Sequence, residues 1–293
     1  MGFDNAYEAL IEENDPRWAF GTGFTDPLAG IDTTVPAGVD GADLATYCLM
    51  LGDDALVMSH RLQEWCANAP ELEDEVALAN IGLDLLGQAR LLLARAGTAD
   101  GTGRSEDDYA FGREGHEFRN VRLVEAPNGD FARSMARLLV FATWRLALLD
   151  RLRTSADPVL AAIAAKAVKE VTYHRDYAAQ WVVRLGDGTA LSHERMQAGL
   201  DAVWPLVGEL FATHPVEARL AALGIAVDPV ATREEFDDVI ARVLAAATLT
   251  LPSVGARRGV AGRAGRDGVH TEALGFLLAE LQSVARALPG ATW

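Results

Sequence analysis

Glu170 and His174 lie four residues apart in the stretch KEVTYHRDYAAQW, residues 169–181. If this stretch is helical, both side chains lie on one face of the helix, and a carboxylate and an imidazole could bind the same metal ion. Four-helix proteins with two iron or manganese ions use such residues: two helices each provide a Glu, and the other two each provide a Glu-x-x-His motif. The remaining helices therefore decide whether a metal centre is complete.

Only part of such a ligand set is present elsewhere in the sequence. Asp84 lies on a polar stripe of an apolar segment, but the residue three positions later is Gly87 rather than histidine. Three positions after Glu170 stands Tyr173, so the motif is interrupted there as well. Residues 131–149, another apolar segment, contain no Asp, Glu, His, Asn, Gln or Cys. Because a pair of irons needs a carboxylate from each helix, we expect no di-iron centre in this chain.

What remains of the set is Asp84, Glu170 and His174, with Asp54 as a possible fourth ligand. In one interpretation, which we favour, these are buried polar groups that pair with one another or with a basic residue, because a buried charge needs compensation. It assigns the chain no metal site and no catalytic residue. In the alternative, a free-standing enzyme holds one metal ion at Asp84, Glu170 and His174. The candidate basic partners are Arg61, Arg90 and Lys166.

A second candidate site is a glycine-rich basic segment, LPSVGARRGVAGRAGRDG, near the end of the chain. Arginine side chains in a loop can bind phosphates, such as those of a coenzyme A thioester or a nucleotide. The same side chains could contact an acidic partner subunit or simply face solvent, and the sequence does not decide among these three roles. The arginines concerned are Arg257, Arg258, Arg263 and Arg266.

Composition limits the possible partners and the cellular location of the chain. The chain has 293 residues, of which 50% are hydrophobic, and a net charge of −16, so it can form a large core and should repel nucleic acids and anionic membranes. No apolar run approaches a membrane span and the first residues do not resemble a secretion signal, so we expect a cytoplasmic protein. Cys48 and Cys66 are too far apart along one expected helix to form a disulfide, and both are expected to be buried.

The elements that must position these residues are helices. Apolar residues recur at three- and four-residue spacing, and no segment alternates as a strand, so the sequence predicts an all-α fold with a four-helix bundle as its core and additional C-terminal helices. The second helix is apolar on nearly every side, which is typical of a buried central helix. The helices are expected over residues 44–66, 70–96, 131–152, 158–186, from 192 onward, 233–250 and 270–287.

Local signals define where these helices begin and end. Asp130 and Asp157 are expected to cap the helices that follow them, and Ser192 to cap a helix that Pro205 then kinks or breaks. Thr232 and Glu235 match a capping box. On the first helix, Asp53 is expected on the face opposite the apolar stripe.

The chain is expected to divide into two parts. Residues 1–40 are rich in Gly, Pro and Thr and form an extension, in which Trp18, Phe20 and Phe24 could dock on a surface. Residues 41–293 form a single helical domain. Residues 97–129 are expected to be a long connection with a short helical piece near 114–119.

Several runs closely resemble the PaaC subunits of the 1,2-phenylacetyl-CoA epoxidases, which are multicomponent monooxygenases. The likeness extends from Leu44 to Trp293 and leaves the first 40 residues outside. The longest runs are LGDDALVMSHRLQEWCANAPELEDEVALANIGLDLLGQARLLL, REGHEFRNVRLVEAPNGDFARSMARLL and LAAIAAKAVKEVTYH. Shorter ones are RLGDGT, WPLVGELF and the C-terminal GVHTEALGFLLAELQSVARALPGATW.

The resemblance implies a ferritin-like bundle that is a structural, non-catalytic subunit and holds no cofactor itself. In that family the related PaaA subunit carries the di-iron centre and binds phenylacetyl-CoA, and PaaC pairs with it. PaaB bridges such pairs, and the reductase PaaE passes electrons from NADPH through FAD and a 2Fe-2S cluster. The reaction converts phenylacetyl-CoA and oxygen to the ring 1,2-epoxide.

Overall fold

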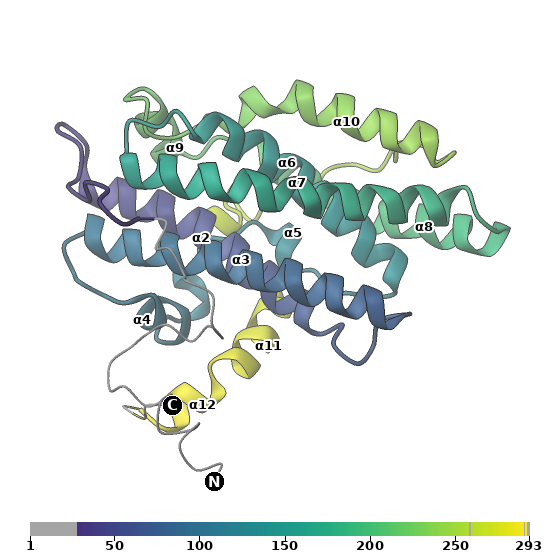
Figure 1. Ribbon diagram of the computed structural model, residues 1–293, viewed down its shortest axis with the longest axis horizontal. Coiled ribbons are helices and arrows are strands. Elements are labelled where there is room, and N and C mark those ends of the chain that lie inside the picture. Colours follow the sequence, from purple (N-terminus) through teal and green to yellow (C-terminus); the bar gives the residue numbers. More distant parts are fainter. Residues whose placement is uncertain (1–27, 258, 290, 292–293) are drawn as a thin grey trace, which may run out of the picture.

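Four long helices form a ferritin-like bundle in the computed structural model, which describes residues 28–257, 259–289 and 291 (Figure 1). Helix α3 packs along α2, α7 packs along α6, and α3 also contacts α7. The described residues contain no strand, so the predicted all-α class is confirmed. The four helices are α2 (Gly41–Gln63), α3 (Leu72–Ala99), α6 (Phe131–Leu152) and α7 (Pro158–Gly186).

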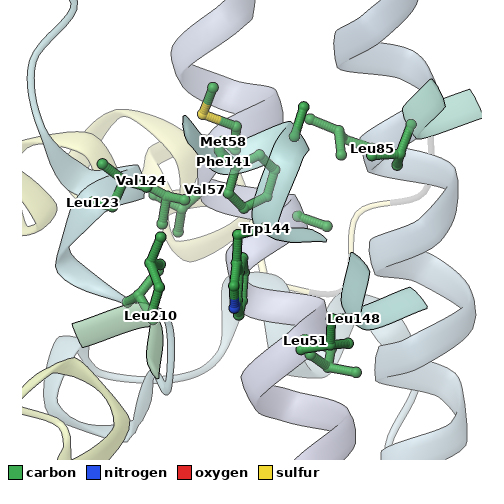
Figure 2. Close-up of a cluster of buried hydrophobic side chains, with 14 of the residues drawn as sticks. Leu51, Val57, Met58, Leu85, Leu123, Val124, Phe141, Trp144, Leu148 and Leu210 are labelled. Carbon is green, nitrogen blue, oxygen red and sulfur yellow. The ribbon is translucent and has the colours of Figure 1, made fainter. Parts of the chain in front are cut away.

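Helix α6 is the central helix of the fold. Nearly all of its side chains are buried, because α7 and α8 (Ala190–Val203) pack on it and α10 (Arg233–Ala246) covers it further. Its Phe141 and Trp144 lie in a cluster of apolar side chains from several elements (Figure 2). The neighbours include Val57 and Met58 of α2, Leu85 of α3, and Leu123 and Val124 of α5 (Arg122–Glu125).

Helix α3 is not the buried central helix that its composition suggested. Leu72, Val76 and Leu83 are 70%, 52% and 60% exposed, because α2 and α7 cover only part of its circumference. Among the described helices it is also the one long and apolar enough to cross a membrane by length and composition, and 44% of its most apolar window is buried. The expectation that no run reaches this length was therefore wrong.

Shorter elements fill the connection before α6 and the C-terminal part. The connection holds α4 (Glu106–Phe111) and α5, and the piece expected near residues 114–119 is a single 3-10 turn, η1 (Gly115–Glu117). As predicted, Pro205 ends α8, and the chain continues as a 3-10 helix, η2 (Trp204–Phe211). The remaining elements are α9 (Pro215–Ala221), η3 (Pro229–Thr232), η4 (Gly265–Asp267), α11 (Glu272–Leu281) and α12 (Ser283–Ala287). The last two replace the single helix expected over 270–287 and extend away from the bundle beside α4 (Figure 1).

Two of the predicted helix caps are confirmed and two are wrong. Asp130 and Asp157 accept hydrogen bonds from backbone amides three residues later. The cap of α8 is Thr189, with Ser192 at the third helical position accepting a hydrogen bond from the Thr189 amide. Thr232 does not cap α10, because its hydroxyl donates to the carbonyl of Pro229 instead.

The described part of the N-terminal extension lies against the domain. Leu28, Ile31, Val35 and Val39 pack on the core, and Arg95 of α3 donates to the carbonyl oxygen of Thr33. The expected docking of Trp18, Phe20 and Phe24 lies outside the described residues. The two cysteines differ from expectation in one respect: Cys48 is buried in α2, whereas Cys66 follows the end of α2 and is exposed.

Candidate metal centre

The three residues left from the predicted ligand set form two separate contacts between α3 and α7. His174 Nε2 lies 3.0 Å from Asp84 Oδ2. One turn away, the Gln88 side-chain amide donates to Glu170 Oε2 at 2.9 Å, and Lys166 Nζ lies 3.5 Å from Glu170 Oε1. His174 is buried, but the side chains of Asp84 and Glu170 are 38% and 18% exposed. The three residues therefore do not converge on one point.

The two positions at which the Glu-x-x-His motif lacks its histidine, Gly87 and Tyr173, lie on the outer side of the bundle. Gly87 has no atom within 4 Å of where a Cβ would lie, and Tyr173 is half exposed. The inward positions with the same three-residue spacing are one residue further along. They are Leu85 and Gln88 on α3, and Val171 and His174 on α7, all buried. Leu85 and Val171 thus stand where the inner carboxylates of a metal-binding bundle would be, and their side chains cannot ligate.

A cation from the central helix lies in the middle of the bundle. The Arg145 guanidinium donates from Nε to Gln88 Oε1 at 3.0 Å and from Nη1 to the Leu51 carbonyl at 3.3 Å. With the bond from Gln88 to Glu170, these contacts join all four long helices. Burial lowers the pKa of Arg145 to about 10, so the side chain stays charged near neutral pH. Arg145 was not among the residues predicted for the site, because it is not a metal ligand; the signal in the sequence is an arginine within the apolar segment 131–149.

The acids of α2 are bound to cations from other segments. Asp54 Oδ2 accepts from Arg266 Nη2 at 2.8 Å and Asp54 Oδ1 accepts from the Val121 amide at 2.8 Å. Burial raises the pKa of Asp54, and the charge of Arg266 opposes that rise. Asp53, which was expected on the face away from the core, is fully buried and forms an ion pair with Arg113. Neither carboxylate is free to bind a metal.

The predicted arginine cluster is divided by the structure. Arg266 is buried and belongs to the core, where it also donates to the carbonyls of Met50 and Arg119. Arg257 and Arg263 are exposed, and the Arg263 guanidinium donates to the Asp267 carbonyl at 2.9 Å. Arg258 lies outside the described residues. A joint phosphate site of all four arginines is therefore not formed, and only the exposed ones remain available to a ligand.

The residues of the bundle do not fit a di-iron centre. Within the described residues, no three His, Cys, Asp or Glu side chains come close enough together to hold a metal ion. The buried charge of Arg145 would repel a divalent ion, strongly so in a low-dielectric interior. What the arrangement can do is structural: it holds four helices in register through a network of buried polar contacts.

Comparison with known proteins agrees with this architecture. The chain matches the model of the phenylacetic acid catabolic protein family over residues 32–293. The C subunit of the 1,2-phenylacetyl-CoA epoxidase of Escherichia coli (strain K12) is 46% identical to it over 250 residues, which cover 85% of this chain and 99% of that protein. The family match includes every helix of the bundle and the segments that carry Arg113, Arg145 and Arg266. The chain is a member of the phenylacetic acid catabolic protein family.

Proposed function

We propose that this chain is the structural, non-catalytic subunit of a 1,2-phenylacetyl-CoA epoxidase, in which it pairs with and stabilises the di-iron PaaA subunit. The complex acts in the cytoplasm, in the aerobic breakdown of phenylacetate. PaaB bridges the pairs, and the reductase PaaE delivers electrons from NADPH through FAD and a 2Fe-2S cluster. This chain binds none of these cofactors, and nucleic acids and membranes are not among its partners.

The observation that carries the proposal is the position of Arg145. In a metal-binding bundle of this kind, positive charge at the centre comes from the metal ions and the surrounding carboxylates neutralise it. Here a guanidinium supplies the positive charge, and glutamine and backbone oxygens accept its hydrogen bonds. Such a bundle keeps its helices in register without a metal, which suits a supporting subunit. The 46% identity to the C subunit of an epoxidase supports the choice of complex.

Reconstitution tests the proposal. The chain would be purified alone and together with the catalytic subunit, and each preparation would be assayed with reductase, NADPH, oxygen and phenylacetyl-CoA. We expect epoxide and two irons per catalytic subunit only in the joint preparation, and a catalytic subunit that unfolds at a lower temperature without this chain. Epoxide formation by the chain with reductase alone would overturn the non-catalytic role, and failure to co-purify would overturn the pairing.

The contact between Asp84 and His174 favours a second candidate function, an enzyme with a single metal ion. A carboxylate and an imidazole 3.0 Å apart could share such an ion after a small movement of Asp84. Against this, Glu170 is engaged by Gln88 and Lys166. Metal analysis of His174→Ala, with His116→Ala at an exposed histidine of η1 as a surface control, decides between the two. Loss of a bound metal together with activity in His174→Ala alone would establish the second function.

A phosphate-binding role for the arginine loop is tested in the assembled complex. Arg257→Glu and Arg263→Glu reverse the two exposed charges that the structure describes. A several-fold loss of thioester affinity would support coenzyme A binding by the loop. Unchanged thioester affinity with weaker subunit assembly would instead assign the loop to a partner contact.

A further inference from the structure

Asn128 is the asparagine of the sequence that a glycine follows. An asparagine in this setting is prone to deamidation, because the glycine has no side chain to hinder attack of its backbone nitrogen on the asparagine side chain. The pair lies in residues 126–130, which precede α6 and which we name the entry loop. Gly129 is exposed there with a φ of +63°, and no described residue accepts a hydrogen bond from its backbone amide. The attacking nitrogen is therefore not engaged.

The side chain of Asn128 is held by groups from two helices. At the end of α2, its Nδ2 donates to the Arg61 carbonyl oxygen at 2.7 Å and to Glu64 Oε2 at 2.8 Å. Its Oδ1 accepts a hydrogen bond from Arg137 Nη2 of α6. The backbone carbonyl of Asn128 accepts from Ser134 Oγ at 3.1 Å. Asn128 thus joins the end of α2 to the start of α6 and closes the entry loop.

Deamidation requires these contacts to break. The Gly129 nitrogen forms a bond to Asn128 Cγ, the Cγ–Nδ2 bond breaks, and ammonia leaves with the proton that the Gly129 nitrogen loses. Water then opens the five-membered imide ring at either carbonyl, which gives aspartate or isoaspartate, and no oxidant or cofactor is consumed. Ring closure draws Cγ toward the backbone, so Nδ2 and Oδ1 lose their partners. Hydrogen bonds to charged groups such as Glu64 and Arg137 are among the stronger ones, so the closed loop resists the reaction.

The product of deamidation does not fit the closed loop. An aspartate at position 128 has no N–H group, so the Arg61 carbonyl would lose its donor. The new carboxylate would also face the Glu64 carboxylate, which now lies 2.8 Å from Asn128 Nδ2, and two like charges at that distance repel. Arg137 is buried and would gain a counter-charge, but its guanidinium contacts Oδ1 and the Ala126 carbonyl, not the side that faces Glu64. The closed loop therefore accommodates the amide and disfavours the acid.

We propose that Asn128 is a modification site that deamidates slowly while the entry loop is closed and rapidly when it opens, and that the acidic product hinders the loop from closing again. Opening one loop costs less free energy than unfolding the whole chain, so the site responds to loosening between α2 and α6 in a folded protein. Because the lost ammonia is not regained, the chain keeps a lasting record of such opening. The inference is independent of the proposed function, because the chemistry lies within one chain.

Incubation of the full-length chain at mildly alkaline pH, followed by peptide mass spectrometry, measures the conversion of Asn128. We expect conversion to be about tenfold or more slower in the folded parent than in the same chain unfolded in guanidinium chloride. Glu64→Ala should raise the rate in the folded chain several-fold. The matched control is Asp150→Ala, because Asp150 also pairs with an arginine three residues away but lies outside the entry loop. Equal rates in the folded and unfolded parent, or no increase in a folded Glu64→Ala variant, would overturn the proposal.

Asn128→Asp tests the effect of the product. We expect faster hydrogen exchange of the backbone amides at the end of α2 and in the entry loop, and unchanged exchange in α10, which lies elsewhere in the fold. Adding Glu64→Gln should slow the exchange again, because the glutamine amide can donate to the new carboxylate. Glu64→Gln alone should exchange as the parent does. Exchange in Asn128→Asp as slow as in the parent would overturn the proposed effect of the product, and a lack of recovery would reject repulsion by Glu64 as its cause.

Discussion

Arg266 donates to Asp54 at 2.8 Å, which joins the segment before α11 to the middle of α2 across 212 residues of sequence. Both side chains are buried, and Arg266 further donates to the carbonyls of Met50 and Arg119. An arginine that the sequence placed in a basic surface loop thus serves as the counter-ion of a core carboxylate. The C-terminal segment is held to the bundle by this ion pair.

Removal of Arg266 should destabilise the protein strongly. Arg266→Ala leaves the Asp54 carboxylate buried without its partner, and we expect a loss of about 3–5 kcal/mol in the free energy of unfolding. Arg263→Ala removes an exposed arginine three residues earlier. It should change the free energy of unfolding by less than about 0.5 kcal/mol. Urea unfolding followed by circular dichroism measures both. A small effect of Arg266→Ala would contradict the role of the ion pair.

The same variant should change how stability depends on pH. Burial raises the pKa of Asp54, and Arg266 opposes that rise, so the pKa should be higher still in Arg266→Ala. A carboxyl whose pKa is raised in the folded state keeps its proton where the unfolded chain has lost it, so stability falls as pH rises above the unfolded value. The deficit of Arg266→Ala relative to the parent in the free energy of unfolding should therefore grow as pH rises above the unfolded pKa of an aspartate. A deficit independent of pH would indicate lost packing instead.

Arg145 and Gln88 should act as a coupled pair. Arg145→Met leaves the Gln88 carbonyl without its buried donor and removes a charge near Asp54, so we expect a loss of about 2–4 kcal/mol. Adding Gln88→Leu to Arg145→Met also removes the side-chain carbonyl that Arg145→Met leaves without a donor. The double variant should be more stable than the sum of the two single losses predicts, by about 1 kcal/mol or more. Strict additivity in unfolding measurements would show that the two side chains do not interact.

His174→Ala should affect stability without affecting metal content. The imidazole is buried and contacts Asp84, so its removal should cost about 1–3 kcal/mol through lost packing and a lost hydrogen bond. Elemental analysis of parent and variant purified side by side should find equal and negligible iron. Iron present in the parent and absent from the variant would contradict a purely structural role for His174.

The two cysteines should differ in reactivity. Burial raises the pKa of the Cys48 thiol, which disfavours the reactive thiolate, whereas Cys66 is exposed beyond the end of α2. A thiol reagent should modify one cysteine in the folded chain and two after unfolding. Cys66→Ser should remove the fast reaction and leave the slow one. Rapid modification of both thiols in the folded parent would contradict the burial of Cys48.

Much of the helical framework could be predicted from local sequence. The spacing of apolar residues placed the four long helices to within a few residues, and Asp130, Asp157 and Pro205 act at the positions where they were expected to. These features depend on residues within one or two helical turns of each other, so they can be recognised from a short stretch of sequence. Where two neighbouring residues compete for one role, as Thr189 and Ser192 do, the choice depends on backbone geometry that the sequence does not contain.

The interior of the bundle was decided by tertiary structure. Sequence spacing identified Asp84, Glu170 and His174 as candidates, but the three-residue spacing counted from Asp84 and Glu170 leads to Gly87 and Tyr173, which both lie on the outer side of the bundle. A helix turns by about 100° per residue, so composition alone cannot fix which of two adjacent residues faces a partner.

The sequence by itself therefore determined the fold class, the main helices and an incomplete set of metal ligands. Only the tertiary structure decided that Arg145 is the central charge, that Arg266 belongs to the core and that one face of α3 is left open. Each of these depends on contacts between residues far apart in the chain. Local patterns carry no information about such contacts, because packing brings those residues together only when the helices assemble.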